Sequence, residues 1–322
     1  MGKIFPDVEK WAEDVRSGDV RALSRAITAI ENHHQNAESL LRILFPHSGH
    51  AYLTGITGAP GTGKSTLVDK LAAYYRQQKE SVGVIAVDPT SPYSGGAILG
   101  DRIRMQDHAS DSGMFIRSMA TRGFLGGLAG TTAEVSLLLD AAGKKQVLIE
   151  TVGVGQDEID IVRLADCVVV VVVPGLGDDI QNMKAGLMEI ADIFVVNKSD
   201  REGAHRVEQQ LNAMLSLVMP QHGWHPPVVR TVASENHGID TLAAAVAKFR
   251  EHFAARPERQ SKQVERWKKR LIELVDVRLL ERAFGGPAGD AQLNDLAMAV
   301  ADRRTDPFTA VHEILARSGL DR

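Results

Sequence analysis

A nine-residue run, Gly58-Ala59-Pro60-Gly61-Thr62-Gly63-Lys64-Ser65-Thr66, constrains the fold of this chain more than any other feature. It fits the pattern G-x-x-x-x-G-K-[ST] and follows an apolar segment, so it stands where a strand would turn into a helix. Glycines let backbone N–H groups turn towards phosphate oxygens, and the following helix points its positive end at the same anion. A lysine here can reach the β- and γ-phosphates, and a serine hydroxyl can bind Mg²⁺. The run therefore predicts a phosphate-binding loop (P-loop) in preference to an ordinary glycine-rich turn.

Short apolar segments alternate with helical segments from Ala51 to about Phe253. We expect strands at Tyr52–Thr57, Val82–Val87, Phe115–Arg117, Gln146–Ile149, Cys167–Val173, Ile193–Val196 and Val228–Val232. Val, Ile and Leu dominate these segments with little polar alternation, which is typical of strands buried on both faces. The pattern predicts an α/β fold: a P-loop NTPase with a mostly parallel central sheet covered by helices on both faces, plus N-terminal and C-terminal helical extensions.

Helical spacing of apolar residues continues on both sides of this region. Val8, Trp11 and Val15 begin one such pattern, and Val264 and Trp267 begin another. We therefore expect an N-terminal helical extension over residues 1–48, a P-loop domain over 49–254 and a C-terminal helical arm over 255–322.

The tetrapeptide Asn197-Lys198-Ser199-Asp200 comes directly after the expected strand Ile193–Val196 and fits the N-K-x-D pattern of GTPases. A carboxylate at Asp200 can accept hydrogen bonds from the N1–H and the 2-amino group of guanine. Adenine offers neither donor, so the carboxylate would lose its partners. The stem of Lys198 can pack over the base. Asn and Asp are ordinary residues after a strand, but the position of this tetrapeptide after a P-loop in the same α/β pattern favours GTP.

A third loop, Val232-Ala233-Ser234, follows the last expected strand. GTPases often place a Ser-Ala-Lys type loop there, and its backbone N–H groups meet the guanine O6. Val232 replaces the usual Ser or Cys, so the backbone contact could survive while support from the side chain is lost.

Acidic residues stand at or near expected strand ends: Asp88, Asp101 and Glu150. Carboxylates at the C-terminal edge of a parallel sheet can hold Mg²⁺ or orient the attacking water, and strand-end acids can also simply cap the next helix. We favour the functional interpretation for Asp88 and Glu150, while spacing alone does not decide for Asp101. Gln156 could position water, and is equally the start of a solvated helix.

Composition excludes several classes of protein. The net charge of -4 argues against broad nucleic-acid binding, which needs a basic face. One cysteine, Cys167, excludes an intramolecular disulfide and a cysteine-rich metal site, and we expect no structural metal. The longest apolar run is too short to span a bilayer, and the N-terminus lacks the pattern of a signal peptide, so we expect a cytoplasmic protein without membrane contact.

The chain resembles the methylmalonyl-CoA mutase-associated GTPases, the MeaB and ArgK family of the SIMIBI class. The resemblance runs through most of residues 20 to 250 and fades in the C-terminal helices. Its segments are GAPGTGKST at 58–66, AVDPTSPYSGGAILGDRIRM at 86–105, ETVGVGQDE at 150–158, GDDIQNMKAG at 177–186 and NKSD at 197–200.

The resemblance implies a GTPase that binds GTP or GDP with Mg²⁺ and escorts an adenosylcobalamin-dependent acyl-CoA mutase. Adenosylcobalamin would belong to that partner, whose cofactor loading the GTPase gates and which it protects. The resemblance implies catalytic roles for Lys64, Asp101 and Glu150. The implied Mg²⁺ ligands are Ser65, Asp88, Asp101 and Glu150. Segments near 88–105, 150–158 and 177–186 are implied to be switches, and Gln156, Asp179, Gln181 and Lys184 are candidate switch or partner residues. The family also implies a homodimer built partly by the C-terminal arm.

Two departures from the family pattern are Val232 and the stretch Met119–Leu125, which is Ser-rich in several relatives. Two other functions remain open from the residues alone. A metallochaperone GTPase would need a Cys/His cluster that one cysteine and dispersed histidines do not supply. A non-catalytic, nucleotide-dependent docking module conflicts with the intact Lys64, Ser65 and acidic residues.

Overall fold

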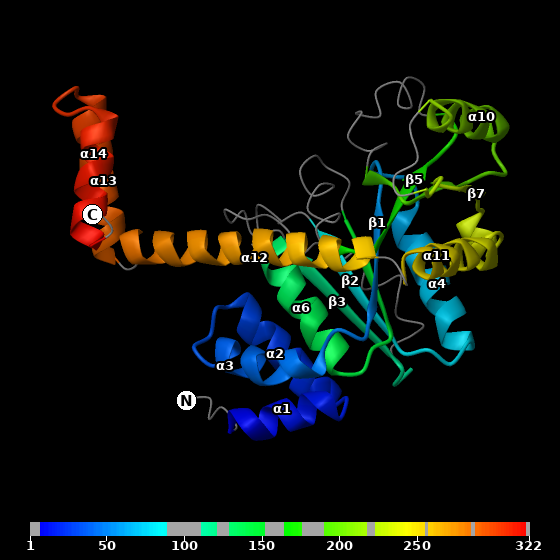
Figure 1. Cartoon of the computed structure of the whole chain (residues 1–322), viewed down its shortest axis with the longest axis horizontal. Coiled ribbons are helices and arrows are strands. Elements are labelled where there is room, and N and C mark those ends of the chain that lie inside the picture. Colours follow the sequence, from blue (N-terminus) through cyan, green and yellow to red (C-terminus); the bar gives the residue numbers. More distant parts are fainter. Residues whose placement is uncertain are drawn as a thin grey trace. The chain divides into compact units, whose positions relative to one another are not determined.

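The computed structural model describes residues 7–88, 111–120, 129–151, 164–175, 190–217, 223–254, 257–284 and 287–319. The chain divides into two compact units, Met1–Arg259 and Gln260–Arg322. The first unit contains a parallel sheet with helices packed against it, and the second is helical (Figure 1). The three-part division expected from the sequence stays a prediction.

The sheet has seven strands in the order β3-β2-β4-β1-β5-β6-β7. Their bounds are β1 Tyr52–Thr57, β2 Val82–Asp88, β3 Met114–Ala120, β4 Gln146–Glu150, β5 Cys167–Val172, β6 Ile193–Val196 and β7 Val228–Arg230. Each neighbouring pair is parallel. The predicted α/β class and its parallel sheet are thus confirmed, and the carboxyl ends of all strands share one edge.

Helices cover both faces of the sheet, as expected for strands with continuous apolar runs. One core combines α4 (Lys64–Gln77) and α11 (Ile239–Ala254) with strand residues such as Val169 and Val171. The other core combines α6 (Ala129–Ala141), α10 (Ala204–Leu215) and the N-terminal helices with the alternate residues, such as Val168 and Val170. Successive residues of β5 therefore pack into the cores on opposite faces of the sheet.

The N-terminal helices α1 (Val8–Arg16), α2 (Val20–Glu31) and α3 (Ala37–Leu44) pack against α6, and the short 3-10 helix η1 (Phe45–His47) follows them. The fully buried Trp11 donates its indole N–H to the carbonyl of Ala22, which joins α1 to α2. An ion pair between Glu31 and Arg117 joins α2 to β3. The carboxylate of Asp140 in α6 accepts hydrogen bonds from the backbone N–H groups of residues 49–51, just before β1.

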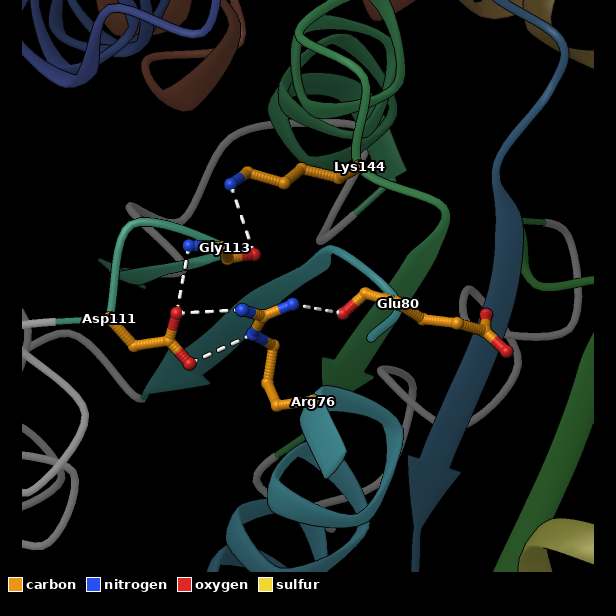
Figure 2. Close-up of polar contacts among 5 residues, drawn as sticks. All are labelled: Arg76, Glu80, Asp111, Gly113 and Lys144. Carbon is orange, nitrogen blue, oxygen red and sulfur yellow. Dashed lines mark hydrogen bonds and ion pairs between the residues drawn. The ribbon is translucent and has the colours of Figure 1, made fainter. Parts of the chain in front are cut away.

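A polar cluster ties α4 to the opposite edge of the sheet, at the amino ends of β2, β3 and β4 (Figure 2). Arg76 makes two bonds to the carboxylate of Asp111, of 2.8 and 2.9 Å, and a third to the carbonyl of Glu80. The ammonium of Lys144 donates to the carbonyl of Gly113 over 3.2 Å. A Cβ added at Gly113 would lie 2.0 Å from Cζ of Arg76, so a larger residue there would displace the guanidinium from this position.

The second unit contains most of α12 (Pro257–Phe284), with α13 (Pro287–Ala301) and α14 (Pro307–Ser318). Asp306 caps α14 by accepting the N–H groups of Phe308 and Thr309, and the hydrogen bond from the Thr309 side chain lowers the pKa of Asp306. Many large apolar side chains of this unit are exposed, in contrast to those of the first unit.

Candidate GTP-binding site

The glycine-rich run forms the turn between β1 and α4 that the sequence predicts. Gly63 is the N-cap of α4 with a φ of 88°, in the left-handed region that favours glycine. A Cβ there would lie 2.5 Å from Nδ2 of Asn197, and a Cβ at Gly58 would lie 2.2 Å from the carbonyl oxygen of Val171. Glycine is therefore required for close packing as well as for the turn.

Lys64 is only 6% exposed, and its ammonium lies within the loop. Nζ donates to the carbonyl oxygens of Gly58, over 2.8 Å, and Ala59, over 3.1 Å. A phosphate oxygen bound by the loop can replace these carbonyls and take the charge of the ammonium, which is what phosphoryl transfer needs.

Ser65 and Glu150 meet beside the loop, although they are 85 residues apart. The hydroxyl of Ser65 donates to Oε1 of Glu150 over 2.6 Å. Glu150 is the last residue of β4, paired in register with Ile56 of β1 and Ala86 of β2, so it lies at the carboxyl edge of the sheet centre. The arrangement brings a hydroxyl and a carboxylate together at the start of the helix that follows the P-loop.

The N-K-x-D segment begins directly after β6 and is hydrogen-bonded to the P-loop. Asn197 is 2% exposed and donates from Nδ2 to the carbonyl of Thr62 over 2.8 Å. Its Oδ1 accepts the hydroxyl of Thr231, over 3.0 Å, and the backbone N–H of Ala233, over 3.2 Å. One buried amide therefore links three loops at the nucleotide edge.

Lys198 and Asp200 are more exposed than this buried amide. Lys198 has a φ of 54°, and its Nζ donates to the carbonyl of Gly61 over 2.7 Å, so its stem spans from the N-K-x-D segment to the P-loop. Asp200 is exposed at the same edge, where its carboxylate is open to a base.

The loop Val232-Ala233-Ser234 closes on itself. Val232 exchanges two backbone hydrogen bonds with His237, of 3.1 and 3.2 Å, and residues 233–235 form a 3-10 turn between them. The side chain of Val232 is 8% exposed and packs inward. This backbone pair and the hydrogen bond from Ala233 to Asn197 hold the loop in shape. The loop therefore does not need the side chain of the usual Ser or Cys.

Some predicted residues cannot be placed. Asp88 is the last residue of β2, which puts its backbone at the carboxyl edge, and its side chain is not described. The others lie outside the described residues: Asp101, Gln156, Asp179, Gln181 and Lys184. Their roles stay predictions, as do those of the placed residues.

Sequence reasoning missed Thr231, which we expected to be an ordinary strand residue. β7 ends at Arg230, and Thr231 turns its hydroxyl to Asn197 while its backbone carbonyl accepts from Ser199. The sequence carries one signal for it: a threonine directly precedes Val232, the first residue of the loop that is predicted to bind guanine.

Within the described residues, no group of three or more His, Cys, Asp and Glu side chains is placed to hold a metal ion. Across the same part of the chain, we find no helix that combines the length and the apolar character of a membrane span.

A P-loop, a hydroxyl and carboxylate beside it, and an N-K-x-D segment bonded to it, all at one edge of a parallel sheet, define a P-loop GTPase. The chain belongs to the MeaB family: the family model described as methylmalonyl Co-A mutase-associated GTPase MeaB matches residues 23–288. It is a GTP hydrolase, since its relatives are named GTPases.

Curated relatives cover nearly the whole chain. A putative GTPase of Pyrococcus abyssi is 47% identical over 315 residues, covering 96% of each chain. The GTPase ArgK of Escherichia coli is 34% identical over 312 residues, covering 93% of each. The mitochondrial methylmalonic aciduria type A homolog of Mus musculus is 32% identical over 326 residues, which covers 96% of this chain and 79% of the mouse protein.

A solved structure confirms the fold. The crystal structure of an LAO/AO transport system kinase superposes with a TM-score of 0.71 at 26% identity, covering 95% of this chain and 96% of that one.

Proposed function

We propose that this GTPase is the nucleotide-dependent chaperone of an adenosylcobalamin-dependent acyl-CoA mutase, methylmalonyl-CoA mutase or a relative. In the cytoplasm it would gate cofactor loading of the mutase and protect the loaded enzyme. The observation that carries the proposal is the match of residues 23–288 to a family whose description names mutase association. The printed name of the mouse relative, a methylmalonic aciduria type A homolog, supports the same direction.

GTP would bind with Mg²⁺. The donors at the site suit this hard cation, which prefers oxygen ligands and keeps several waters and phosphate oxygens. Ser65 and Glu150, 2.6 Å apart, would hold it from the protein side, with Asp88 and Asp101 as further predicted ligands. The cation would neutralise charge on the phosphates, while Lys64 and the P-loop bind and orient them.

A homodimer is part of the proposal, with the second copy covering the C-terminal arm. The exposed large apolar side chains of α12, α13 and α14 support it, since a soluble monomer rarely leaves so many uncovered. They are Val264, Trp267, Leu271, Ile272, Leu274, Val275, Val277, Leu279, Leu280, Leu293, Met298, Phe308 and Val311. Light scattering of wild type and Ile272→Glu tests this part: we expect a dimer and a monomer, respectively, and a monomeric wild type contradicts it.

The function is tested by titrating the GTPase with the mutase encoded in the same genome. We expect the mutase to raise the rate of GTP hydrolysis and cofactor transfer to depend on GTP. Lys64→Ala should abolish hydrolysis and transfer. Lys184→Ala should leave nucleotide affinity intact but uncouple hydrolysis from transfer. A hydrolysis rate that no cobalamin-dependent mutase changes would contradict the proposed partner and leave the GTPase activity standing.

A further inference from the structure

A hydrogen bond between two buried threonines joins the strand that leads into the P-loop to the strand that ends at Glu150. Oγ1 of Thr151 donates to Oγ1 of Thr57 over 2.9 Å, and the two residues are 1% and 0% exposed. Thr57 ends β1 and is followed by Gly58, while Thr151 directly follows Glu150. The contact therefore lies one residue from the P-loop and one residue from the carboxylate that faces Ser65.

Backbone contacts around the two threonines also hold the ends of β1 and β4 together. The N–H of Thr151 donates to the carbonyl of Ile56 over 3.1 Å, which extends the β1–β4 ladder by one bond. On the other side, Gly58 packs so closely on β5 that a Cβ would lie 2.2 Å from the carbonyl oxygen of Val171. The first residue of the P-loop is thus held between β4 and β5, with the hydroxyl pair on the β4 side.

Loss of one hydroxyl would leave the other buried without a hydrogen-bond partner. A buried hydroxyl without a hydrogen-bond partner is destabilising, so the pair favours the observed alignment of the two strand ends. A shift of the β4 end relative to β1 would move Glu150 relative to Ser65, and a misplacement of about 1 Å at a catalytic site can cost as much as about a hundredfold in rate.

We propose that Thr57 and Thr151 are positioning residues for GTP hydrolysis, because their hydrogen bond sets where Glu150 stands relative to the P-loop and to Ser65. Neither side chain touches the nucleotide in this role. The inference rests on the proposed function in one respect, namely that Ser65 and Glu150 hold Mg²⁺.

The chain offers a matched control on the same strand. Thr54 is also fully buried in β1, and its hydroxyl has no hydrogen-bond partner in the part of the chain that the structure describes. Thr54→Val therefore removes a buried threonine hydroxyl without removing a contact, whereas Thr57→Val and Thr151→Val each break the pair. Thr57→Ser and Thr151→Ser keep the hydroxyl and lose only a methyl group.

The experiment measures three quantities for these variants and for the double Val variant. They are the Tm, the affinity for a fluorescent GDP analogue with Mg²⁺ and with EDTA, and kcat as a function of Mg²⁺ concentration. For Thr57→Val and Thr151→Val we expect kcat to fall about tenfold and the gain in GDP affinity from Mg²⁺ to shrink, with the affinity in EDTA changed less than about threefold. The double variant should be no worse than the single ones, because the same bond is lost. Thr54→Val and the two Ser variants should resemble wild type in kcat and in the Mg²⁺ dependence of GDP affinity.

The inference is overturned if Thr57→Val shows the same Mg²⁺ dependence as Thr54→Val, or if the effects of the two Val substitutions add. A variant that lowers only the Tm would show a purely structural role and overturn it as well. Ser65→Ala and Glu150→Gln separate the two proposals. If Ser65→Ala and Glu150→Gln leave the Mg²⁺ dependence of GDP affinity unchanged, the Mg²⁺ assignment is wrong, and so is the inference about the threonines. If these two variants abolish the Mg²⁺ dependence while the threonine variants do not change it, only the inference about the threonines is wrong.

Discussion

The side-chain amide of Asn197 donates a hydrogen bond of 2.8 Å to the carbonyl oxygen of Thr62, which lies 135 residues earlier in the chain. The oxygen of the same amide accepts from Thr231 and Ala233, so each end of the group has the partner that its chemistry requires. The P-loop, the N-K-x-D segment and the loop at Val232 are therefore bonded through one buried side chain. If all three bind the nucleotide as the sequence predicts, binding needs no rearrangement of one loop relative to the others.

Asn197→Ala should weaken GDP binding about a hundredfold and lower the Tm. The substitution leaves the carbonyl of Thr62 and the hydroxyl of Thr231 buried without this partner, and each unmade bond costs about 1–3 kcal/mol. Titration with a fluorescent GDP analogue and a thermal melt measure the two effects. Ser199→Ala is the control, because Ser199 contacts Thr231 through its backbone N–H. Equal GDP affinity in Asn197→Ala and wild type would show that the three loops are held together by other contacts.

Asp200→Asn should reverse the choice of base. The exposed carboxylate of Asp200 can accept from N1–H and the 2-amino group of guanine, and an amide can instead donate to the 2-oxo group of xanthine. We expect GDP affinity to fall about a hundredfold while XDP affinity rises, since lost hydrogen-bond partners discriminate strongly. Competitive binding of GDP, XDP and ADP to the wild type and to the variant measures this change in base preference. Equal affinity of the wild type for ADP and GDP would contradict the role of Asp200.

The sequence predicts β1 and β6 to the residue and the other strands to within a few residues, because continuous Val and Ile runs bounded by polar residues leave few alternatives. β7 is the instructive exception. Val228 to Val232 reads as one apolar strand, yet the ladder ends at Arg230. The N–H of Thr231 still donates to the carbonyl of Val196 in β6, while its carbonyl accepts from Ser199 and its hydroxyl donates to Asn197. Val232 instead pairs with His237, five residues later, in a turn. The contacts of Thr231 come from residues far away in the sequence, which the local pattern does not contain.

Within the site, the P-loop and the N-K-x-D segment are predictable because their chemistry demands contiguous residues at fixed spacing. The contacts that join these two segments are not predictable from the sequence. Thr57 and Thr151 are ordinary β-branched residues in sequence, and only the β1–β4 register brings their hydroxyls together. The same holds for Asp140, whose bonds to residues 49–51 connect α6 to the entry of β1.

Gly63→Ala should impair GDP binding as well as stability. Its Cβ would lie 2.5 Å from Nδ2 of Asn197, so the amide that joins the loops must move. Gly143→Ala is the matched control, since Gly143 has a similar φ of 78° with nothing within 4 Å of an added Cβ. Both variants carry the strain of a left-handed residue, about 1 kcal/mol, but only Gly63→Ala should lose GDP affinity, by about tenfold or more. Equal GDP affinity in the two variants would show that the close approach to Asn197 is of no consequence.

Lys144→Met should change how stability depends on pH. Burial lowers the pKa of Lys144 below its usual 10.5, the nearby charge of Arg76 lowers it further, and Asp111 opposes both. Between the lowered pKa and 10.5, the unfolded chain keeps a proton that the folded chain has released. The free energy of unfolding therefore rises with pH across this interval, and below it the cost of burying the charge is constant.

The variant lacks this dependence, so the Tm of wild type minus that of Lys144→Met should become more positive as the pH rises through the lowered pKa of Lys144 towards 10.5. Lys145→Met is the control, because Lys145 is the exposed neighbour of the buried lysine. Thermal melts at a series of pH values give the comparison. If the curves of wild type and Lys144→Met run parallel while Lys144 remains bonded to Gly113, burial of the ammonium at this edge of the sheet carries no cost, and the cluster of Figure 2 is more hydrated than its geometry indicates.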